Sequence, residues 1–332
     1  MKMIEKDSKL IVNGYPNPFG YAYDGRVIYN IKDAKIPFYK LKEWDFYQIT
    51  SRKFSFYAVL GHVGYATSIN CYLFEFDTKK TISVGKLVPF KKVKLDNNAS
   101  MDSTVLYKDK NYKMEFRKVG NNRFIEMEAI SKIYGKCEVK IKLEETQKDN
   151  ILVCTPFENK KEFYLNQKIC LMKASGFAQF GDNYYEFKED ENFGLLDWGR
   201  GVLPFKHHWI WGSGSGIVDG KYFGFNIGSF GINDYGSENI FFYDGKSYKM
   251  DKVDISFDEA DHMKEWTYHG GNNEFEFTMK PIYDNNSITK VLWVDNNCHQ
   301  MFGDFNGYIV IDGKKIEIKN FFAFTESAYN RW

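Results

Sequence analysis

The chain has 332 residues, of which 43% are hydrophobic and 27% charged, and its 45 lysines and arginines nearly balance its 44 aspartates and glutamates. This composition excludes a disordered chain, and the balanced charge argues against nucleic acid or an acidic membrane surface as a partner. The length favours two domains.

The first residues, MKMIEKDSKLIVNGYPNP, lack the apolar core of a signal peptide, and no later apolar run is long enough to cross a membrane. The five cysteines form no CxxC pair, and their odd number argues against a disulfide framework. We therefore expect a cytoplasmic protein without membrane contact.

Alternation of apolar and polar residues predicts β-strands along the whole chain, for example in CYLFEFD (71–77), RFIEMEA (123–129) and EFEFTMK (274–280). Between such runs, Asp-Gly and Asn-Gly pairs predict tight turns, because both central residues of a type I′ turn need a positive φ. These pairs are Asp24-Gly25, Asp219-Gly220, Asp244-Gly245, Asn306-Gly307 and Asp312-Gly313. The only candidates for short helices are FDEADHMKEW (257–266) and the last residues.

Segments of the first half resemble segments of the second half in the same order, which predicts an internal duplication; the alternative is the general similarity of β-meanders. The pairs are EWDFYQI (43–49) with HWIWGSG (208–214), FYAVLGHVGY (56–65) with YFGFNIGSFG (222–231), NCYLFEFD (70–77) with NIFFYDGK (239–246), GNNRFIEMEA (120–129) with GNNEFEFTMK (271–280), and GKCEVKIKL (135–143) with GYIVIDGKKIEI (307–318).

Two halves of many antiparallel strands predict an all-β protein of two tandem barrels or sandwiches. We expect an N-terminal domain at 1–155, a connecting arm at 156–194, and a C-terminal domain at 195–332 that carries the candidate site. An eight-stranded barrel is wide enough to hold one small ligand.

The stretch LLDWGRGVLPFKHHWIWGSGSG (195–216) concentrates polar and aromatic residues. If HHWIW is a strand, His207 lies on the same face as Trp209 and Trp211, and His208 lies on the opposite face. A histidine beside tryptophans in a dry pocket has a lowered pKa and can act as a base. The alternative is that its imidazole bonds to a neighbouring carbonyl and fills space.

Asp197 and Arg200 in DWGRG also have two interpretations. They either form a pair that braces a tight corner between the two halves, or they act as an acid or base and as a clamp for an anion. Downstream, NIGSFGINDYGSEN (226–239) supplies Glu238 as a second carboxylate for an acid–base couple. Asn226, Asp234 and Asn239 lie in the same run, which is otherwise a loop held by Asx turns.

Other residues and motifs are weaker candidates. His299, Gln300 and Glu326 are more often structural than catalytic. His207-His208 and Cys298-His299 are adjacent pairs whose side chains diverge on a strand, so we predict no metal site. The run GSGSG (212–216) lacks the lysine and the helix of a phosphate loop and the α/β setting of a nucleophile elbow, so we predict no cofactor.

The runs DWGRG…P…W.W, G.N.G…EN, FG.F.G and the closing NRW resemble the bacterial family known as domain of unknown function 2804, over nearly the whole chain. In overall plan the chain is also similar to two-domain lipocalin-like proteins that include carotenoid hydratases. These resemblances imply two tandem lipocalin-like domains and a small-molecule pocket, but they identify no reaction.

The leading hypothesis is an enzyme that acts on a small molecule by acid–base chemistry, such as hydration, isomerisation or a glycoside-type reaction. In it, the catalytic residues are Asp197, Glu238, His207 and His208, and the substrate is bound by Arg200, Trp209, Trp211, Asn226, Asn239 and His299. The alternatives are a non-catalytic carrier of a lipid, polyene or carbohydrate, and a structural module without a ligand. The substrate and the oligomeric state stay open.

Overall fold

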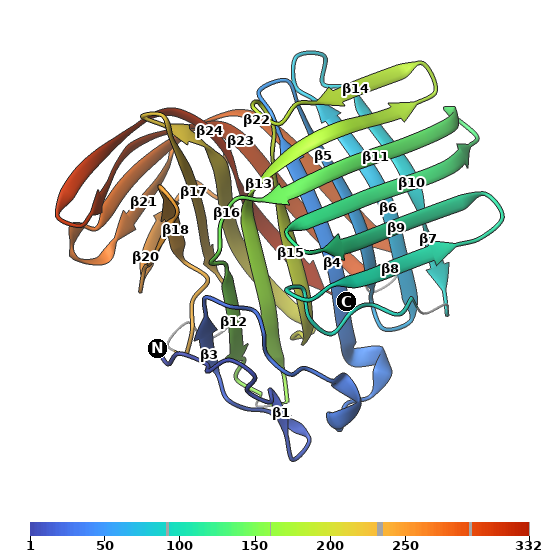
Figure 1. The fold of residues 1–332 in the computed structure, drawn as a ribbon, viewed down its shortest axis with the longest axis horizontal. Helices are drawn as coiled ribbons and strands as arrows, with labels where there is room; N and C mark the ends of the chain where they lie inside the picture. Colours follow the sequence, from blue (N-terminus) through green and yellow to red (C-terminus); the bar gives the residue numbers. More distant parts are fainter. Residues whose placement is uncertain (91–92, 160, 231–234, 292–293, 332) are drawn as a thin grey trace.

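The computed structural model describes residues 1–90, 93–159, 161–230, 235–291 and 294–331. The described residues form β-strands and three single-turn 3-10 helices, Ile31–Asp33, Phe38–Lys40 and Gly271–Asn273. Within these ranges no helix is long and apolar enough to cross a membrane. The fold is all-β, as predicted, and consists mainly of two curled antiparallel sheets, one running from blue to yellow-green and the other from yellow to red in Figure 1.

The first sheet contains the strands β3 (Gly20–Ala22), β4 (Leu41–Thr50), β5 (Phe54–His62), β6 (Ala66–Glu75), β7 (Thr81–Pro89), β8 (Ser103–Lys108), β9 (Tyr112–Val119), β10 (Asn122–Ser131), β11 (Gly135–Glu145), β12 (Ile151–Pro156), β13 (Phe163–Phe180), β14 (Asn183–Phe187) and β15 (Phe193–Val202). Their order is β7-β6-β5-β4-β15-β13-β11-β10-β9-β8, with β12 and β14 paired to β13 and with β3 paired to β12. A separate small ribbon joins β1 (Ile11–Val12) and β2 (Tyr15–Pro16).

The second sheet contains β16 (Lys206–Val218), β17 (Lys221–Ser229), β18 (Ile240–Tyr243), β19 (Lys246–Lys249), β20 (Val253–Ser256), β21 (Trp266–Gly270), β22 (Phe275–Val291), β23 (Val294–Ile311) and β24 (Lys314–Arg331). Their order is β19-β18-β17-β16-β24-β23-β22-β21-β20. The last three strands are long and form the red and orange part of the sheet in Figure 1.

Both sheets follow the same path, as a duplication predicts. The chain forms four strands toward one edge (β4–β7 and β16–β19), crosses to the far edge, and returns until β13 or β24 is reached. In the second sheet β24 pairs directly with β16, whereas in the first sheet β15 is inserted between β13 and β4. Four of the sequence matches fall on equivalent strands. The fifth does not, because 135–143 lies in β11 while 307–318 crosses the β23–β24 turn.

Three predicted turns are confirmed, because an aspartate with a φ of 51° precedes a positive-φ glycine at Asp219-Gly220, Asp244-Gly245 and Asp312-Gly313. The other two predictions are wrong. Asn306-Gly307 lies inside β23 at a register shift, where a Cβ on Gly307 would meet the carbonyl oxygen of Glu276 at 2.0 Å. Asp24-Gly25 follows β3, which pairs with β12 and forms no hairpin with its successor.

The two predicted helices are also corrected. The last residues belong to β24. In the 257–265 segment, the side chains of Asp258 and Asp261 accept hydrogen bonds from the backbone N–H groups of Ala260 and Met263. Such local bonds compete with the helical backbone bonds, so the segment forms turns instead.

The segment 156–194, predicted as a connecting arm, contributes β13 and β14 to the first sheet, and β15 lies in the middle of that sheet. The reason is the run FYLNQKICLM (163–172), which is buried on both faces although it contains Asn166, Gln167 and Lys168, so no exposed face marks it as a strand. The first sheet thus extends to Val202, and the second begins at Lys206.

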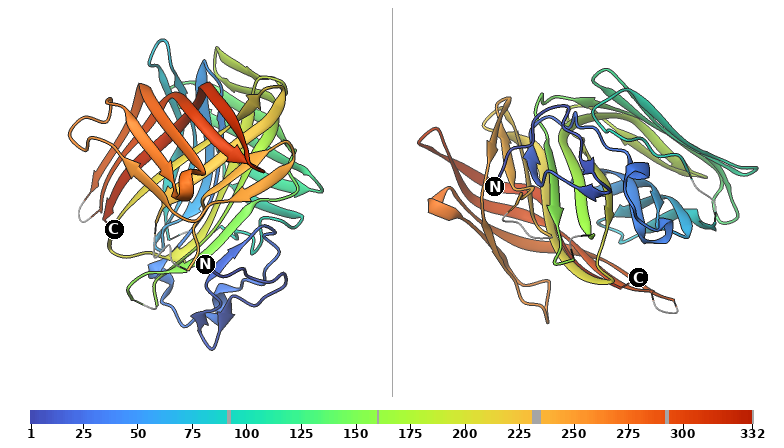
Figure 2. Two further views of the ribbon diagram at one scale, coloured as in Figure 1. Left: turned by 90° about the vertical axis from the view of Figure 1, so that its left-hand side faces the viewer. Right: turned by 90° about the horizontal axis from the view of Figure 1, so that it is seen from below.

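Each sheet has one face that packs on its own hydrophobic core, and part of the opposite face of each sheet packs on the other sheet. We call the zone between the sheets the seam; Figure 2 shows it from two sides. In the seam, Phe76 and Leu195 from the first half cluster with Trp211, Phe302 and Phe324 from the second. In strands that border the seam, alternation therefore places one set of side chains in a domain core and the other in the seam, whereas in strands such as β7 and β8 the second set is largely exposed.

Candidate functional site

A cavity of about 620 Å³ lies in the seam. This volume is in the usual range for small-molecule sites. The cavity lies between the two halves, at the junction, and not inside the C-terminal half-barrel. Its lining comes from both sheets and their connections: Trp44, Phe46, Tyr57, Val59, Tyr72, Tyr164, Lys168, Asp197, Leu203, Trp209, Ile210, Trp211, Phe230, Glu238, Asn285, Asn286, Ser287, Ile288, Asn296, Cys298, Gln300 and Glu326.

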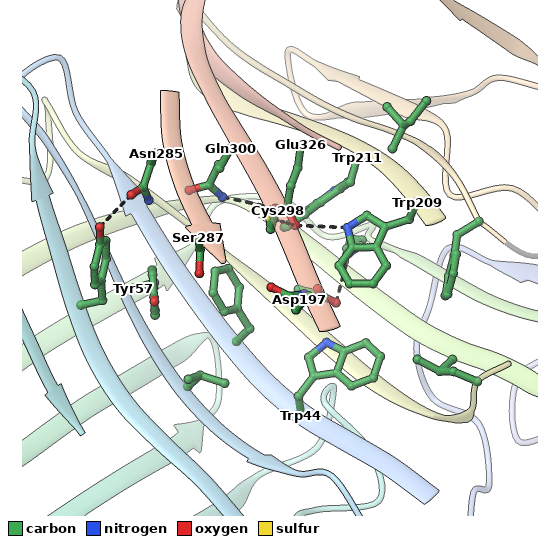
Figure 3. Close-up of a pocket in the computed structure, with 18 of the residues that line it drawn as sticks. Trp44, Tyr57, Asp197, Trp209, Trp211, Asn285, Ser287, Cys298, Gln300 and Glu326 are labelled. Atoms are coloured by element: carbon green, nitrogen blue, oxygen red, sulfur yellow. Dashed lines mark hydrogen bonds and ion pairs between the residues drawn. The ribbon is translucent and has the colours of Figure 1, made fainter. Parts of the chain in front are cut away.

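Aromatic rings form much of the cavity wall (Figure 3). Tyr57 and Tyr72 stack with ring centroids 4.8 Å apart, and the Tyr72 hydroxyl donates to Oδ1 of Asn285 at 2.7 Å. On another part of the wall, Trp44 stacks on Tyr164 with centroids 6.4 Å apart. Such a wall suits a ligand with large apolar or unsaturated parts.

The polar end of the cavity is built around Lys168 on β13. Its ammonium lies 3.1 Å from Oδ1 of Asp197, 3.9 Å from Oε2 of Glu238, and 3.8 Å from the ring centre of Trp211. The Nδ2 of Asn166 also donates to Oδ1 of Asp197, at 2.5 Å. Both contacts use the same oxygen, so Oδ2 of Asp197 has no partner among the described residues.

Glu238 and Tyr164 form the other side of this group. The Tyr164 hydroxyl donates to Oε2 of Glu238 at 3.3 Å. Burial raises the pKa of Glu238, and the neighbouring charge of Asp197 raises it further, while the ammonium of Lys168 opposes the shift. The raised pKa favours the neutral acid, which can donate a proton into the cavity.

Glu326 on β24 is a third carboxyl on the wall. It accepts hydrogen bonds from Nε1 of Trp209 at 3.1 Å, Sγ of Cys298 at 3.2 Å and Nε2 of Gln300 at 3.4 Å. Burial raises the pKa of Glu326. Its three partners are electrically neutral donors, so they orient the carboxyl without compensating a negative charge.

Two predicted binding residues stand behind the wall rather than in it. Asn226 is fully buried; it accepts from Nε1 of Trp211 at 2.7 Å and donates to the carbonyl of Glu238 at 3.0 Å. Asn239 accepts from the backbone N–H of Gly228 at 2.8 Å. Asn226 therefore positions two wall residues, and Asn239 fixes the backbone of Gly228, which lies against the side chain of Glu238. Asp234, from the same run, lies outside the described residues.

The predicted Asp197–Arg200 pair is wrong, because three residues of separation put the two side chains on opposite faces of β15. Arg200 is fully buried, does not line the cavity, and bonds to Oδ1 of Asp45 at 2.8 Å and to Oδ1 of Asp96 at 3.2 Å. It also donates to the carbonyl of Trp44 at 2.7 Å. Arg200 therefore has a bracing role, and the predicted role as a clamp for an anion is wrong.

The predicted histidines do not line the cavity either. His207 stacks on Trp209, and its Nδ1 lies 2.9 Å from the carbonyl oxygen of Pro204. This agrees with the alternative interpretation, in which the imidazole bonds to a neighbouring carbonyl and fills space. His208 stacks on Tyr329 with centroids 4.0 Å apart, and its Nε2 lies 3.0 Å from Oγ of Ser327. His299 points away from the cavity-facing Cys298 and pairs with Asp284 at 2.8 Å.

Burial lowers the pKa of His208, which gives a test of its environment. The unfolded chain takes up a proton near pH 6.5, whereas folded His208 resists it, so stability falls as the pH drops below about 6.5. The variant His208→Gln has no titrating group at this position, so it lacks this part of the stability loss at low pH. The difference in melting temperature between wild type and variant should therefore shrink between pH 7.5 and pH 5.5. The matched variant at the exposed His269, His269→Gln, should keep the wild-type pH dependence.

Sequence reasoning missed Lys168, Tyr164 and Trp44, and it treated Glu326 as structural. Lys168 and Tyr164 were hidden in the segment predicted as an arm. The usable signal was that Tyr164, Asn166 and Lys168 recur at every second position of an apolar run, which puts polar atoms on one buried face. For Trp44 the usable signal was the repeat, because EWDFYQI (43–49) matches HWIWGSG (208–214) and pairs Trp44 with Trp209.

Gly199 provides space for Trp44. A Cβ at this position would lie 2.0 Å from Cζ2 and 2.1 Å from Cε2 of the Trp44 indole. We expect Gly199→Ala to displace the indole, lower stability by about 1–3 kcal/mol, and weaken binding of the neutral dye Nile red, measured by fluorescence titration. The control Gly271→Ala adds a methyl group where nothing lies within 4 Å, and it should change neither quantity.

Solved structures with the same fold are found at low sequence identity. CghA has a TM-score of 0.60 and 9% identity, with 98% of this chain and 97% of that chain covered. A putative AttH from Nitrosomonas europaea has a TM-score of 0.51, 12% identity and coverage of 86% and 92%. Kievitone hydratase from Nectria haematococca has a TM-score of 0.50, 10% identity and coverage of 98% and 97%. These matches show the fold alone.

No curated protein matches the chain in sequence. The family described as "Domain of unknown function (DUF2804)" matches residues 1–332, the whole length of the sequence, as its motifs indicated. The chain therefore belongs to the DUF2804 family.

Proposed function

We propose that the protein is an enzyme that adds or removes protons on a largely apolar small molecule bound in the seam cavity. The observation that carries this proposal is the pair of carboxyl groups of Asp197 and Glu238, which face the same aromatic-lined cavity with the ammonium of Lys168 between them. Two carboxyl groups in unlike environments are a recurrent basis for acid and base assignments.

The two carboxyl groups take different roles. Asp197, as the carboxylate of the ion pair with Lys168, is the base, and its Oδ2 is the oxygen that accepts the substrate proton. Glu238, whose pKa is raised by burial, is the acid. In hydration, Glu238 gives a proton to one carbon of a double bond, and Asp197 takes a proton from the water that adds to the neighbouring carbon. Elimination is the reverse of these steps. Proton transfer without water amounts to isomerisation.

A glycoside-type reaction also uses two carboxyl groups. We place it behind hydration and isomerisation, because twelve of the twenty-two lining residues are aromatic or aliphatic, and polar ones such as Asn285, Gln300 and Glu326 are already hydrogen-bonded within the wall. The name of one protein of similar fold, kievitone hydratase, agrees with addition of water as the reaction class.

A carrier is the second candidate function. It is favoured by the fact that each carboxyl of the cavity already has a hydrogen-bond donor from the protein: Asn166 for Asp197, Tyr164 for Glu238, and Trp209 for Glu326. We further propose a cytoplasmic location and a small-molecule partner rather than nucleic acid, since all five cysteines are free thiols and the net charge is +1.

The test is an incubation of the protein with a total small-molecule extract in D₂O, and in parallel in H₂¹⁸O. We expect an enzyme of this type to place deuterium on carbon in one or a few compounds, and ¹⁸O as well if water is added, both detected by mass spectrometry. Heat-denatured protein and Glu238→Gln serve as controls and should give no labelled compound.

A carrier gives a different result. It would retain a compound through gel filtration, with the same mass before and after incubation, and Glu238→Gln would still retain it. Label-free retention would therefore replace the enzyme proposal with the carrier, and label in the Glu238→Gln sample would remove the acid role from Glu238.

A further inference from the structure

Acidic side chains outnumber basic side chains on the cavity wall. Three carboxyl groups line it, those of Asp197, Glu238 and Glu326. Among the described residues of the wall, Lys168 is the only lysine, arginine or histidine. Burial raises the pKa values of Glu238 and Glu326, and the charge of Asp197 adds to both shifts while the ammonium of Lys168 opposes them.

Lys168 is already fully engaged and offers little to an anionic ligand. Its side chain is 3% exposed, and its ammonium contacts Asp197, Glu238 and the face of Trp211. An incoming carboxylate or phosphate would have to displace one of these contacts and would face three carboxyl groups. The cavity therefore disfavours anionic ligands such as fatty acids.

Glu326 lacks a counter-ion. No lysine, arginine or histidine nitrogen in the described parts of the chain lies within 4.0 Å of its carboxyl, which is held only by neutral donors. Nearby, the side-chain amide oxygen Oδ1 of Asn166 is buried without a hydrogen-bond donor, on the face of β13 that carries Lys168 and Tyr164 to the cavity. The unsatisfied groups at this end are thus negative or accepting.

The aromatic wall complements these groups, because ring faces attract cations. The ammonium of Lys168, 3.8 Å from the ring centre of Trp211, already shows this interaction on the wall. Trp209, whose indole donates to Glu326, lies on the same face of β16 as Trp211. Figure 3 shows both indoles close to Glu326, with Trp44 and Tyr57 on other parts of the wall.

We propose that the ligand of the seam cavity carries a positively charged nitrogen, an ammonium or quaternary ammonium group, which lies beside Glu326 against the tryptophan rings. This inference rests on the proposed function for the cavity and names the ligand class. The apolar remainder of the ligand occupies the aromatic wall, and the reacting carbon lies toward Asp197 and Glu238.

Three probes with one carbon skeleton test the charge class. Each probe is a 4-phenylbutyl chain with a different end group: trimethylammonium, its uncharged tert-butyl isostere, or carboxylate. Binding of each probe is measured by calorimetry and by tryptophan fluorescence. We expect the cation to bind about tenfold more tightly than the tert-butyl probe, by the worth of one charge-assisted contact, and the carboxylate to bind least. The cationic probe does not titrate, so its affinity should rise with pH as Glu326 and Glu238 ionise beside Asp197, Lys168 and Cys298.

Glu326→Gln keeps the side-chain shape and removes the charge. It should abolish most of the preference for the cation and leave the affinity for the tert-butyl probe within about twofold. Glu317→Gln, at an exposed position on the same strand, should change neither affinity.

Three results would overturn the inference and leave the acid–base proposal standing. The cation and its tert-butyl isostere could bind equally, the carboxylate could bind more tightly than the cation, or the preference for the cation could survive in Glu326→Gln. If none of the three probes binds, the inference also fails. Deuterium labelling in the extract experiment decides the proposed function separately, because it does not depend on these probes.

Discussion

Asp197→Asn is expected to lower turnover of the labelled compound by about 10²–10⁴-fold, the usual contribution of a general acid or base. The carboxamide has nearly the shape of the carboxylate, and its oxygen can still accept from Nδ2 of Asn166 and from Lys168. What it loses is the ability to take up a proton. Affinity for the bound compound should therefore change little, and the measurement is kcat against KM for the compound found by labelling.

A matched control separates catalysis from bracing. Asp244→Asn changes an exposed aspartate in a turn with a φ of 51°, which asparagine also adopts, and should leave turnover and melting temperature unchanged. If Asp197→Asn lowers the melting temperature while turnover stays at the wild-type level, Asp197 is a bracing residue and the acid–base proposal loses its base.

The all-β class and the repeat could be predicted because both are recorded locally. Period-two alternation shows in short windows such as EFEFTMK (274–280), and an Asp-Gly pair at 219–220 specifies its own turn. The domain boundary could not be predicted, because the first ten residues of β13 are buried on both faces and lack the exposed face that would have marked the segment as a strand of the first sheet.

The candidate site was predictable where one short stretch carried it. Asp197, Trp209 and Trp211 lie within 15 residues and all face the cavity, and Glu238 joins them from the next loop. Lys168 and Trp44 could not be placed, because they reach the cavity through strand order and packing between the sheets. A sequence shows which residues share a strand face, but not which other face lies opposite.

Arg200 illustrates the same limit and leads to the largest expected effect on stability. Arg200→Met should lower the free energy of unfolding by about 3–5 kcal/mol, the usual loss when one partner of a buried ion pair is removed. The guanidinium is fully buried and bonds to Asp45 and Asp96. Without it, the carboxyl of Asp45 stays buried, and only the charge of Arg123, which forms no ion pair with it, still favours the carboxylate. Chemical denaturation measures the loss. The exposed pair Arg26–Asp24 provides the control, since Arg26→Gln should leave the free energy of unfolding nearly unchanged.

The charge on Asp45 can be separated from the packing of Arg200 by a second substitution and by pH. Burial raises the pKa of Asp45 to about 7, and Arg200 opposes this shift. In Arg200→Met, a protonated Asp45 needs no counter-ion, so the stability loss should shrink as the pH falls from 8 to 5. The double variant Arg200→Met/Asp45→Asn should recover part of the loss at pH 8 and show no such pH dependence. A loss that is equal at both pH values and unchanged in the double variant would assign it to packing against Trp198, whose ring lies 4.1 Å from the guanidinium.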